Sequence, residues 1–120
     1  MHRSDQRPLR YRCDLLGRFE ISGGRLDVRI LDLSEVGAFV ETSLDLKVGD
    51  RGVLALPLPG GDPWYAEVTV VRFGTAQREL RHARLSHLLV SCPGVDVTFD
   101  RIPDDEIERL RGFLELLDER

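Results

Sequence analysis

The sequence is poor in the residues that build disulfide frameworks and metal centres. Only two of its 120 residues are cysteines, Cys13 and Cys92, which are too few for a disulfide framework or a cysteine-based metal site. The three histidines, His2, His82 and His87, show no metal-ligand spacing relative to these cysteines. We therefore expect no metal site, and we expect both thiols to be reduced and half-buried in the core.

Long hydrophobic runs and catalytic signatures are missing as well. No apolar run approaches the roughly 20 residues that cross a bilayer, and residues 1–12 contain no hydrophobic signal core. The sequence has no Gly-x-Ser-x-Gly turn and no Walker loop. Its acidic residues do not lie in apolar runs that would tune a catalytic pKa. These absences predict a cytoplasmic protein that is not an enzyme and does not insert into a membrane.

Lysine is nearly absent, because Lys47 is the only lysine among 17 basic residues. A GC-rich genome explains such a bias, and so does a need for guanidinium forks, which bind phosphate and guanine edges. The net charge of -4 argues against a DNA or RNA partner. However, residues 1–30 hold seven arginines against four acidic residues, whereas residues 100–120 hold eight acidic residues against four arginines. Any anion-binding face should therefore lie near the N-terminus.

The length and the hydrophobic share of 42% fit a single domain with one modest core. Residues 1–10 are polar and basic, and we predict a flexible arm there. Alternation of apolar and polar residues predicts short strands, with a bulge or bend at Gly17. The expected strands are residues 11–21, 25–33, 38–42, 51–58, 64–73 and 95–99. Such a series indicates a small antiparallel barrel or sandwich.

The last part of the chain predicts an α-helix at about residues 103–118. Pro103 suits a first helical turn, and the acidic residues at 104–106 complement the helix dipole. An apolar stripe follows at helical spacing, formed by Ile107, Leu110, Phe113, Leu114 and Leu117. We expect this helix to cap an open end of the sheet, although the stripe also suits a partner or a dimer face.

The segment 75–91 has no clear period. It contains neither Gly nor Pro, and Leu80 and Ala83 fit one face of a helix, whereas Leu85 and Leu89 alternate as in a strand. We predict an irregular connection or an extended hairpin for this segment.

One segment, Asp32-Leu-Ser-Glu-Val-Gly37, has a pattern of its own at the end of a predicted strand. Strand alternation places Asp32 and Ser34 on one face, and Gly37 lets another backbone approach closely. Taken by itself, the segment is also consistent with a simple Asx or Ser turn between two strands.

This segment resembles the Asp/Asn-x-Ser-x-x-Gly motif of the PilZ domain family, whose members are typically receptors for the bacterial second messenger cyclic di-GMP. The following segments are similar to the family in the same order, namely residues 46–50, 54–60, 66–72 and 94–99. In the last of them, Asp96 replaces the second glycine of a Gly-x-Gly-x-x-Phe pattern. The resemblance implies a mainly β fold, a small six-stranded antiparallel β-barrel over residues 11–120 that ends in an α-helix.

The resemblance also implies which residues bind the ligand. In the family an Arg-x-x-x-Arg motif of the N-terminal arm grips phosphates and guanine edges, while the Asp and Ser of the turn contact a guanine. Arg3 and Arg7 match that motif literally, but Arg10 holds the usual place of the second arginine just before the first strand, which leaves Gln6 at the first position. The candidate ligand-binding residues are therefore Arg3, Arg7, Arg10, Asp32, Ser34 and Gly37.

Two functions follow from the resemblance. The first is a cyclic di-GMP receptor or adaptor, which binds the nucleotide through the arm and the turn, needs no cofactor, and signals by changing a surface that binds a protein partner. The alternative is a degenerate PilZ-fold protein-interaction module, in motility or type IV pilus regulation, that does not bind cyclic di-GMP. The shifted arginines and the segment 75–91 motivate this alternative, and an unrelated small barrel is a third interpretation. Each is compatible with a monomer or a homodimer.

Overall fold

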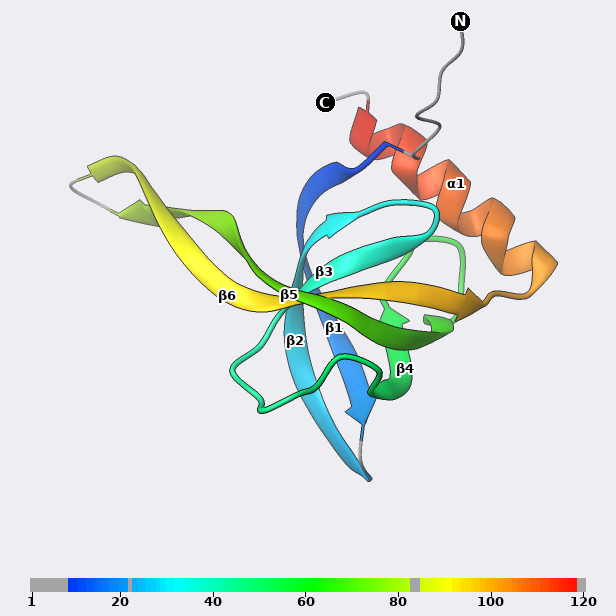
Figure 1. Cartoon of the computed structure of the whole chain (residues 1–120). Coiled ribbons are helices and arrows are strands. Elements are labelled where there is room, and N and C mark those ends of the chain that lie inside the picture. Colours follow the sequence, from blue (N-terminus) through cyan, green and yellow to red (C-terminus); the bar gives the residue numbers. More distant parts are fainter. Residues whose placement is uncertain (1–8, 22, 83–84, 119–120) are drawn as a thin grey trace, which may run out of the picture.

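The computed structural model describes residues 9–21, 23–82 and 85–118, which form six strands and one helix (Figure 1). The elements are β1 Tyr11–Ile21, β2 Gly24–Leu33, β3 Gly37–Glu41, β4 Arg51–Leu56, β5 Trp64–His82, β6 Leu85–Arg101 and α1 Asp104–Asp118. Every strand pairing is antiparallel, and the order β1-β2-β3-β6-β5-β4 closes on itself through β1 and β4. The predicted mainly β class, with antiparallel strands and a C-terminal helix, is confirmed.

The hydrophobic core lies inside this ring of strands, because every second residue of a strand points to the same side. Phe19, Ile30, Leu54 and Val70 are among the side chains with no exposed surface. β3 differs from the other strands because both of its faces are buried. Its residues Ala38 and Val40 belong to the core, whereas Phe39 belongs to a second, smaller cluster with Leu31 and Cys92 on the outside of the ring.

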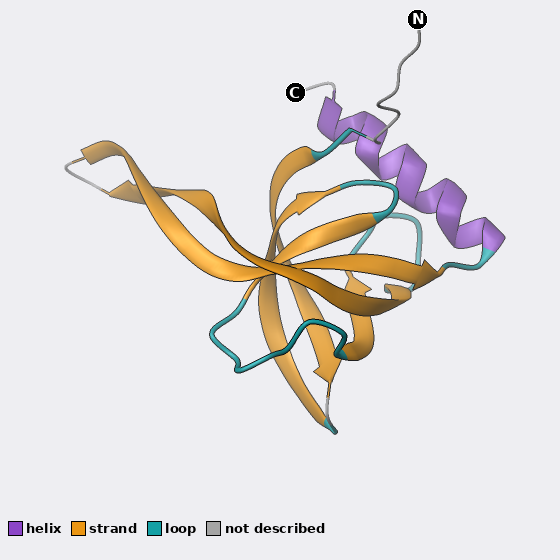
Figure 2. Cartoon of the chain, in the orientation of Figure 1, coloured by secondary structure: helices purple, strands orange, loops and turns teal. Residues whose placement is uncertain are grey.

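α1 lies beside one end of the ring, as Figure 2 shows. Leu110 and Leu114 are buried in the core, so the predicted apolar stripe packs against the strands. The Nε1–H of Trp64 donates a hydrogen bond to the carbonyl oxygen of Glu106 at 2.8 Å. Arg109 Nη2 donates to the carbonyl oxygen of Asp62 at 2.7 Å, which ties the β4–β5 loop to the helix. The predicted capping role of the helix is confirmed.

β5 and β6 continue beyond the ring as a long hairpin that projects from the body of the molecule (Figure 1). Their pairing runs from Glu67 opposite Arg101 to His82 opposite Leu85. The extended hairpin predicted for residues 75–91 is thus confirmed, whereas the irregular connection and the strand limits at 73 and 95 are wrong. A two-stranded ribbon outside the core has no single buried face, so its sequence lacks the alternation that marks the other strands.

The bulge expected at Gly17 is not found there, because Gly17 pairs regularly with Val28. A Cβ atom at Gly17 would lie 2.7 Å from the carbonyl oxygen of Ala55, so this glycine allows β4 to approach β1 closely. The irregularity of β1 lies instead between Arg12 and Leu15.

Candidate functional site

Four residues of neighbouring strands form one row across the outside of the ring. Asp32 of β2 pairs with Phe39 of β3, Phe39 pairs with Asp96 of β6, and Asp96 pairs with Arg72 of β5. Directly paired residues share a face of the sheet. Both chain neighbours of Asp96 are core residues, so the row lies on the outer face. The fold thus places the carboxylates of Asp32 and Asp96 on either side of Phe39, with the guanidinium of Arg72 next to Asp96.

Two bulges bring Asp32 and Arg72 to this face. The pairing of β2 with β3 shifts between Ile30 and Asp32, and the pairing of β5 with β6 shifts between Val70 and Arg72. Ile30 and Val70 point into the core. Strict alternation would turn the side chains of residues 32 and 72 inward as well. Because each bulge adds one residue, both side chains point outward instead.

Arg10, which lies just before β1, contacts both carboxylates of the row from the solvent side. Its Nε and Nη2 atoms donate to Oδ1 of Asp32 at 3.2 and 2.7 Å, and Nη2 also donates to Oδ1 of Asp96 at 2.8 Å. Arg72 donates through Nε and Nη2 to the other oxygen of Asp96, Oδ2, at 2.9 and 2.7 Å. We call Arg10, Asp32, Arg72 and Asp96 the arginine–aspartate cluster. Two positive and two negative groups make it neutral.

Burial in this cluster is uneven. The side chain of Asp96 is only 11% exposed, whereas those of Arg10 and Arg72 are 43% and 69% exposed. A buried carboxylate is costly unless it is paired, and here two guanidinium groups pair with it. Desolvation lowers the pKa of Arg10, but hydrogen bonds and charges from Asp32 and Asp96 outweigh it and raise that pKa above its ordinary value. Arg10 is therefore positively charged at neutral pH.

The predicted turn closes next to this cluster. The hydroxyl oxygen of Ser34 accepts hydrogen bonds from the backbone N–H groups of Val36 and Gly37, both at 3.1 Å, and its O–H donates to the carbonyl oxygen of Gly37. Ser34 is buried, so its hydroxyl stabilises the turn. A Cβ atom at Gly37 would overlap the carbonyl oxygen of Val97, which confirms the predicted close approach of another backbone at this glycine.

The turn also contacts the helix. Arg111 Nε donates to Oε1 of Glu35 at 3.1 Å, and this hydrogen bond is the main cause of a raised pKa of Arg111. A pocket of about 210 Å³ lies between the end of the arm, the turn and α1. Its lining includes Leu9, Glu35, Arg111 and Leu114. The residue before Arg10 therefore faces the same space as the helix.

The structure brings together two of the predicted site residues, Arg10 and Asp32. Ser34 and Gly37 lie in the adjoining turn, and Arg3 and Arg7 fall outside the described residues. Sequence reasoning missed Arg72 and noted Asp96 only as a departure from the family pattern. The sequence signal for Arg72 is misleading, because it follows the core residues Val68 and Val70 at the same spacing of two, where alternation alone would bury it.

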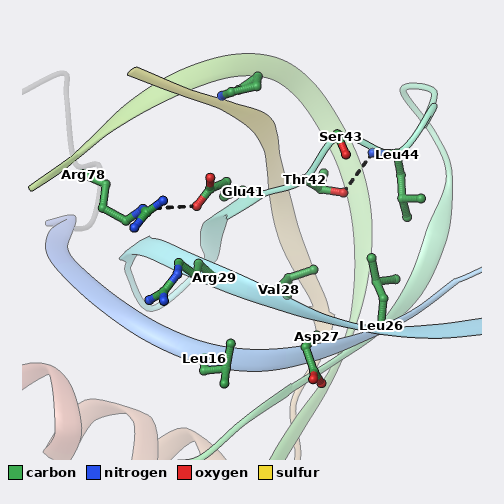
Figure 3. Close-up of a pocket in the computed structure, with 11 residues that line it drawn as sticks. Leu16, Leu26, Asp27, Val28, Arg29, Glu41, Thr42, Ser43, Leu44 and Arg78 are labelled. Carbon is green, nitrogen blue, oxygen red and sulfur yellow. Dashed lines mark hydrogen bonds and ion pairs between the residues drawn. The ribbon is translucent and has the colours of Figure 1, made fainter. Parts of the chain in front are cut away.

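A larger pocket, of about 560 Å³, lies elsewhere (Figure 3). Its lining combines apolar side chains such as Leu16 and Val28 with charged residues that include Arg78 and Glu41, whose Nε and Oε1 atoms are 3.5 Å apart. None of the four residues of the arginine–aspartate cluster lines this pocket. Within residues 9–21, 23–82 and 85–118, no three His, Cys, Asp or Glu side chains gather as metal ligands would. No helix in these ranges has the length and apolarity to span a membrane.

The family model described as PilZ domain matches residues 2–116, which is nearly the whole chain. The chain belongs to the PilZ domain family. The match includes the predicted arm, all six strands and most of α1, so it covers every residue of the arginine–aspartate cluster. No curated protein matches this PilZ domain in sequence.

Solved structures show the same fold. The PilZ domain of YcgR from Escherichia coli, solved with c-di-GMP, has a TM-score of 0.67 at 15% identity, over 95% of this chain and 92% of that one. The Bacillus subtilis inhibitor of motility, MotI/DgrA, has a TM-score of 0.68 at 14% identity, over 99% of this chain and 54% of that one. MrkH, described as a c-di-GMP-dependent transcription regulatory factor, has a TM-score of 0.73 at 18% identity, over 97% and 52%. This PilZ domain thus spans about half the length of the last two proteins.

Proposed function

We propose that this PilZ domain binds cyclic di-GMP at the arginine–aspartate cluster and acts as a receptor or adaptor. The observation that carries the proposal is the contact of Arg10 Nη2 with Asp32 Oδ1 at 2.7 Å. It joins the arginine just before β1 to the aspartate of the Asp-x-Ser-x-x-Gly turn. Membership of a family of cyclic di-GMP receptors supports the choice of ligand, as does the related domain solved with c-di-GMP.

The two side chains have the chemistry that cyclic di-GMP requires. A guanidinium fork matches the O6 and N7 acceptors of guanine, and it also pairs with phosphate. The carboxylate of Asp32 accepts hydrogen bonds, so it suits the N–H donors on the opposite edge of guanine. In the proposal Arg10 binds phosphate and a guanine edge, with Arg3 and Arg7 in support. Ser34 and Gly37 hold the turn in place.

The neighbouring elements supply a route from ligand to partner. Leu9, the turn residue Glu35 and Arg111 of α1 line one pocket beside Arg10. A ligand that draws Arg10 away from Asp32 also moves the end of the arm, which is one wall of that pocket. We propose that the surface formed by arm, turn and helix changes on binding and is the face that a protein partner reads.

Calorimetric titration of the purified protein with cyclic di-GMP at moderate salt tests this function. We expect saturable binding by the wild type and a loss of about 5- to 150-fold in affinity for Arg10→Ala and for Asp32→Ala, since a good bidentate pair contributes about 1–3 kcal/mol. Arg18→Ala is the matched control, because Arg18 lies on β1 but pairs with Asp27 instead of the cluster. A wild type that gives no heat at high ligand concentration would disprove the proposal.

The projecting hairpin favours a second candidate, a protein-interaction module that does not need the nucleotide. Beyond the ring, β6 exposes the apolar side chains of Leu88 and Leu89, which are 45% and 59% exposed. A pull-down compares the wild type with a variant whose hairpin is closed by a two-residue turn after Gln77. Partner capture that is lost in this variant and indifferent to cyclic di-GMP supports the second candidate. Capture that requires the nucleotide excludes it.

A further inference from the structure

The carboxylate of Asp96 lies between two guanidinium groups, with one arginine on each oxygen. Arg10 contacts Oδ1 at 2.8 Å and Arg72 contacts Oδ2 at 2.7 Å. Asp96 is the residue that stands where the family pattern has a glycine, so the anion between the arginines belongs to the protein itself. Arg72 comes from β5, which is far from the N-terminal arm in the sequence.

We infer that Arg72 is a second phosphate-binding residue of this site, and that Asp96 occupies the position which a phosphodiester of the ligand takes between Arg10 and Arg72. The inference rests on the proposed function and names two residues that the turn and arm motifs do not include. It assigns Arg72 a binding role and Asp96 the role of an internal competitor.

The chemistry of the two anions supports this exchange. A phosphodiester, like a carboxylate, carries one negative charge shared between two equivalent oxygens, and guanidinium groups bind both anions through parallel N–H donors. The two arginines already point at the two oxygens of a single anion. A ligand phosphate between them would make the same set of charge-assisted hydrogen bonds without moving Arg72.

Exposure and position single out Arg72 for this role. Its side chain is 69% exposed although it pairs with a buried carboxylate, so solvent and ligand can reach its guanidinium. The bulge beside Val70 turns it onto the same face as Asp32. It therefore supplies from the sheet the second positive charge that the arm lacks at Gln6 in the register defined by Arg10.

Asp96 then sets the affinity of the site. While its carboxylate holds both arginines, a phosphate must displace it, and it repels the phosphate that approaches. Removal of its charge should strengthen binding, whereas removal of Arg72 should weaken it. A merely structural Asp96 predicts the opposite for its own substitution, because loss of a supporting ion pair would loosen the site.

The experiment is a titration of folded protein with cyclic di-GMP for wild type, Asp96→Asn, Arg72→Ala and the double variant. We expect affinity to rise about tenfold or more in Asp96→Asn, the size of one hydrogen bond to a charged group, and to fall about 5- to 150-fold in Arg72→Ala. In the double variant the gain from Asp96→Asn should shrink, because one of the two freed arginines is absent. Asp100→Asn is the control, since Asp100 lies on the same strand and accepts a hydrogen bond from Thr69.

The outcomes separate this inference from the proposed function. Binding by the wild type that is unchanged in Arg72→Ala, or unchanged or weakened in Asp96→Asn, overturns the inference and leaves the proposed function standing. If neither the wild type nor Asp96→Asn binds cyclic di-GMP, both the inference and the proposed function are overturned. Circular dichroism of each variant verifies that it is folded before it is titrated.

Discussion

Arg10 Nη2 lies 2.8 Å from Oδ1 of Asp96, a residue 86 positions later in the chain. The same nitrogen contacts Asp32, so one guanidinium joins β2 to β6 across the outer face of β3. The end of the N-terminal arm is thereby fixed against the sheet at the place where the predicted ligand-binding turn begins. Whatever competes for this guanidinium also changes how the arm meets the sheet.

The forked geometry of the Arg10 guanidinium, in addition to its positive charge, should determine the affinity for the ligand. Arg10→Lys keeps the positive charge but has a single ammonium group, which cannot replace the Nε and Nη2 donors that Arg10 directs at Oδ1 of Asp32, and which cannot bind a guanine edge through two parallel hydrogen bonds. We expect cyclic di-GMP affinity to fall about 5- to 150-fold in this variant, the value of one bidentate pair. Calorimetric dissociation constants, with Arg18→Lys as the control, measure the effect. Equal affinity of Arg10→Lys and wild type would show that only the charge matters.

Ser34 should contribute to stability through the turn. In Ser34→Ala the N–H groups of Val36 and Gly37 lose the oxygen that accepts from both. A buried donor left without a partner costs about 1–3 kcal/mol, so the free energy of unfolding should decrease by that amount. Urea denaturation monitored by circular dichroism measures it. Ser43→Ala is the control because Ser43 is exposed, and an equal effect of both variants would contradict the assigned role.

Two glycines should respond to alanine with opposite signs. The added methyl group at Gly37 overlaps the Val97 carbonyl oxygen, and the backbone must shift to admit it. Such overpacking costs about 1–3 kcal/mol. At Gly112 in α1 the methyl group meets nothing within 4 Å, and alanine favours the helix by about 0.5–1 kcal/mol. Thermal unfolding of both variants tests the pair, and a Gly37→Ala protein as stable as the wild type would refute the close approach.

Much of the fold was predictable because the core-facing residues alternate. Leu26, Val28 and Ile30 mark β2 by their period of two, and the leucines of α1 mark the helix by their longer period. The sequence of the hairpin beyond the ring does not distinguish a hairpin from an irregular connection, because neither face of the hairpin packs along its whole length. The periodicity of apolar residues reflects burial, so it gives no information where a strand extends beyond the core.

The candidate site was only half predictable for a related reason. The sequence identifies Asp32 because it belongs to a motif, and it identifies Arg10 because it lies just before a predicted strand. Arg72 reaches the outer face only because β5 contains a bulge beside Val70. A bulge shifts the inward–outward alternation of every later residue in the strand by one position. No residue type in this stretch indicates that a bulge is present. The partnership of Arg72 with Asp96 therefore depends on a register that sequence alone does not determine.

Docking of α1 on the ring should depend on Leu110. This side chain is 1% exposed in the core, whereas Leu116 of the same helix is 53% exposed. Leu110→Ala should lower the free energy of unfolding by about 2–5 kcal/mol, since it removes buried surface and leaves a cavity. Leu116→Ala, as the control, should change it by less than about 0.5 kcal/mol.

The fluorescence of Trp64, which is buried and donates its indole N–H to the Glu106 carbonyl oxygen, reports on the same contact. We expect its emission to shift to longer wavelength in Leu110→Ala as water reaches the loosened interface, and to stay unchanged in Leu116→Ala. Equal stability of the two variants would mean that the helix is not part of the core. The helix would then not be a fixed wall of the pocket that Leu9, Glu35 and Arg111 line, and a movement of Arg10 could not change a surface formed with it.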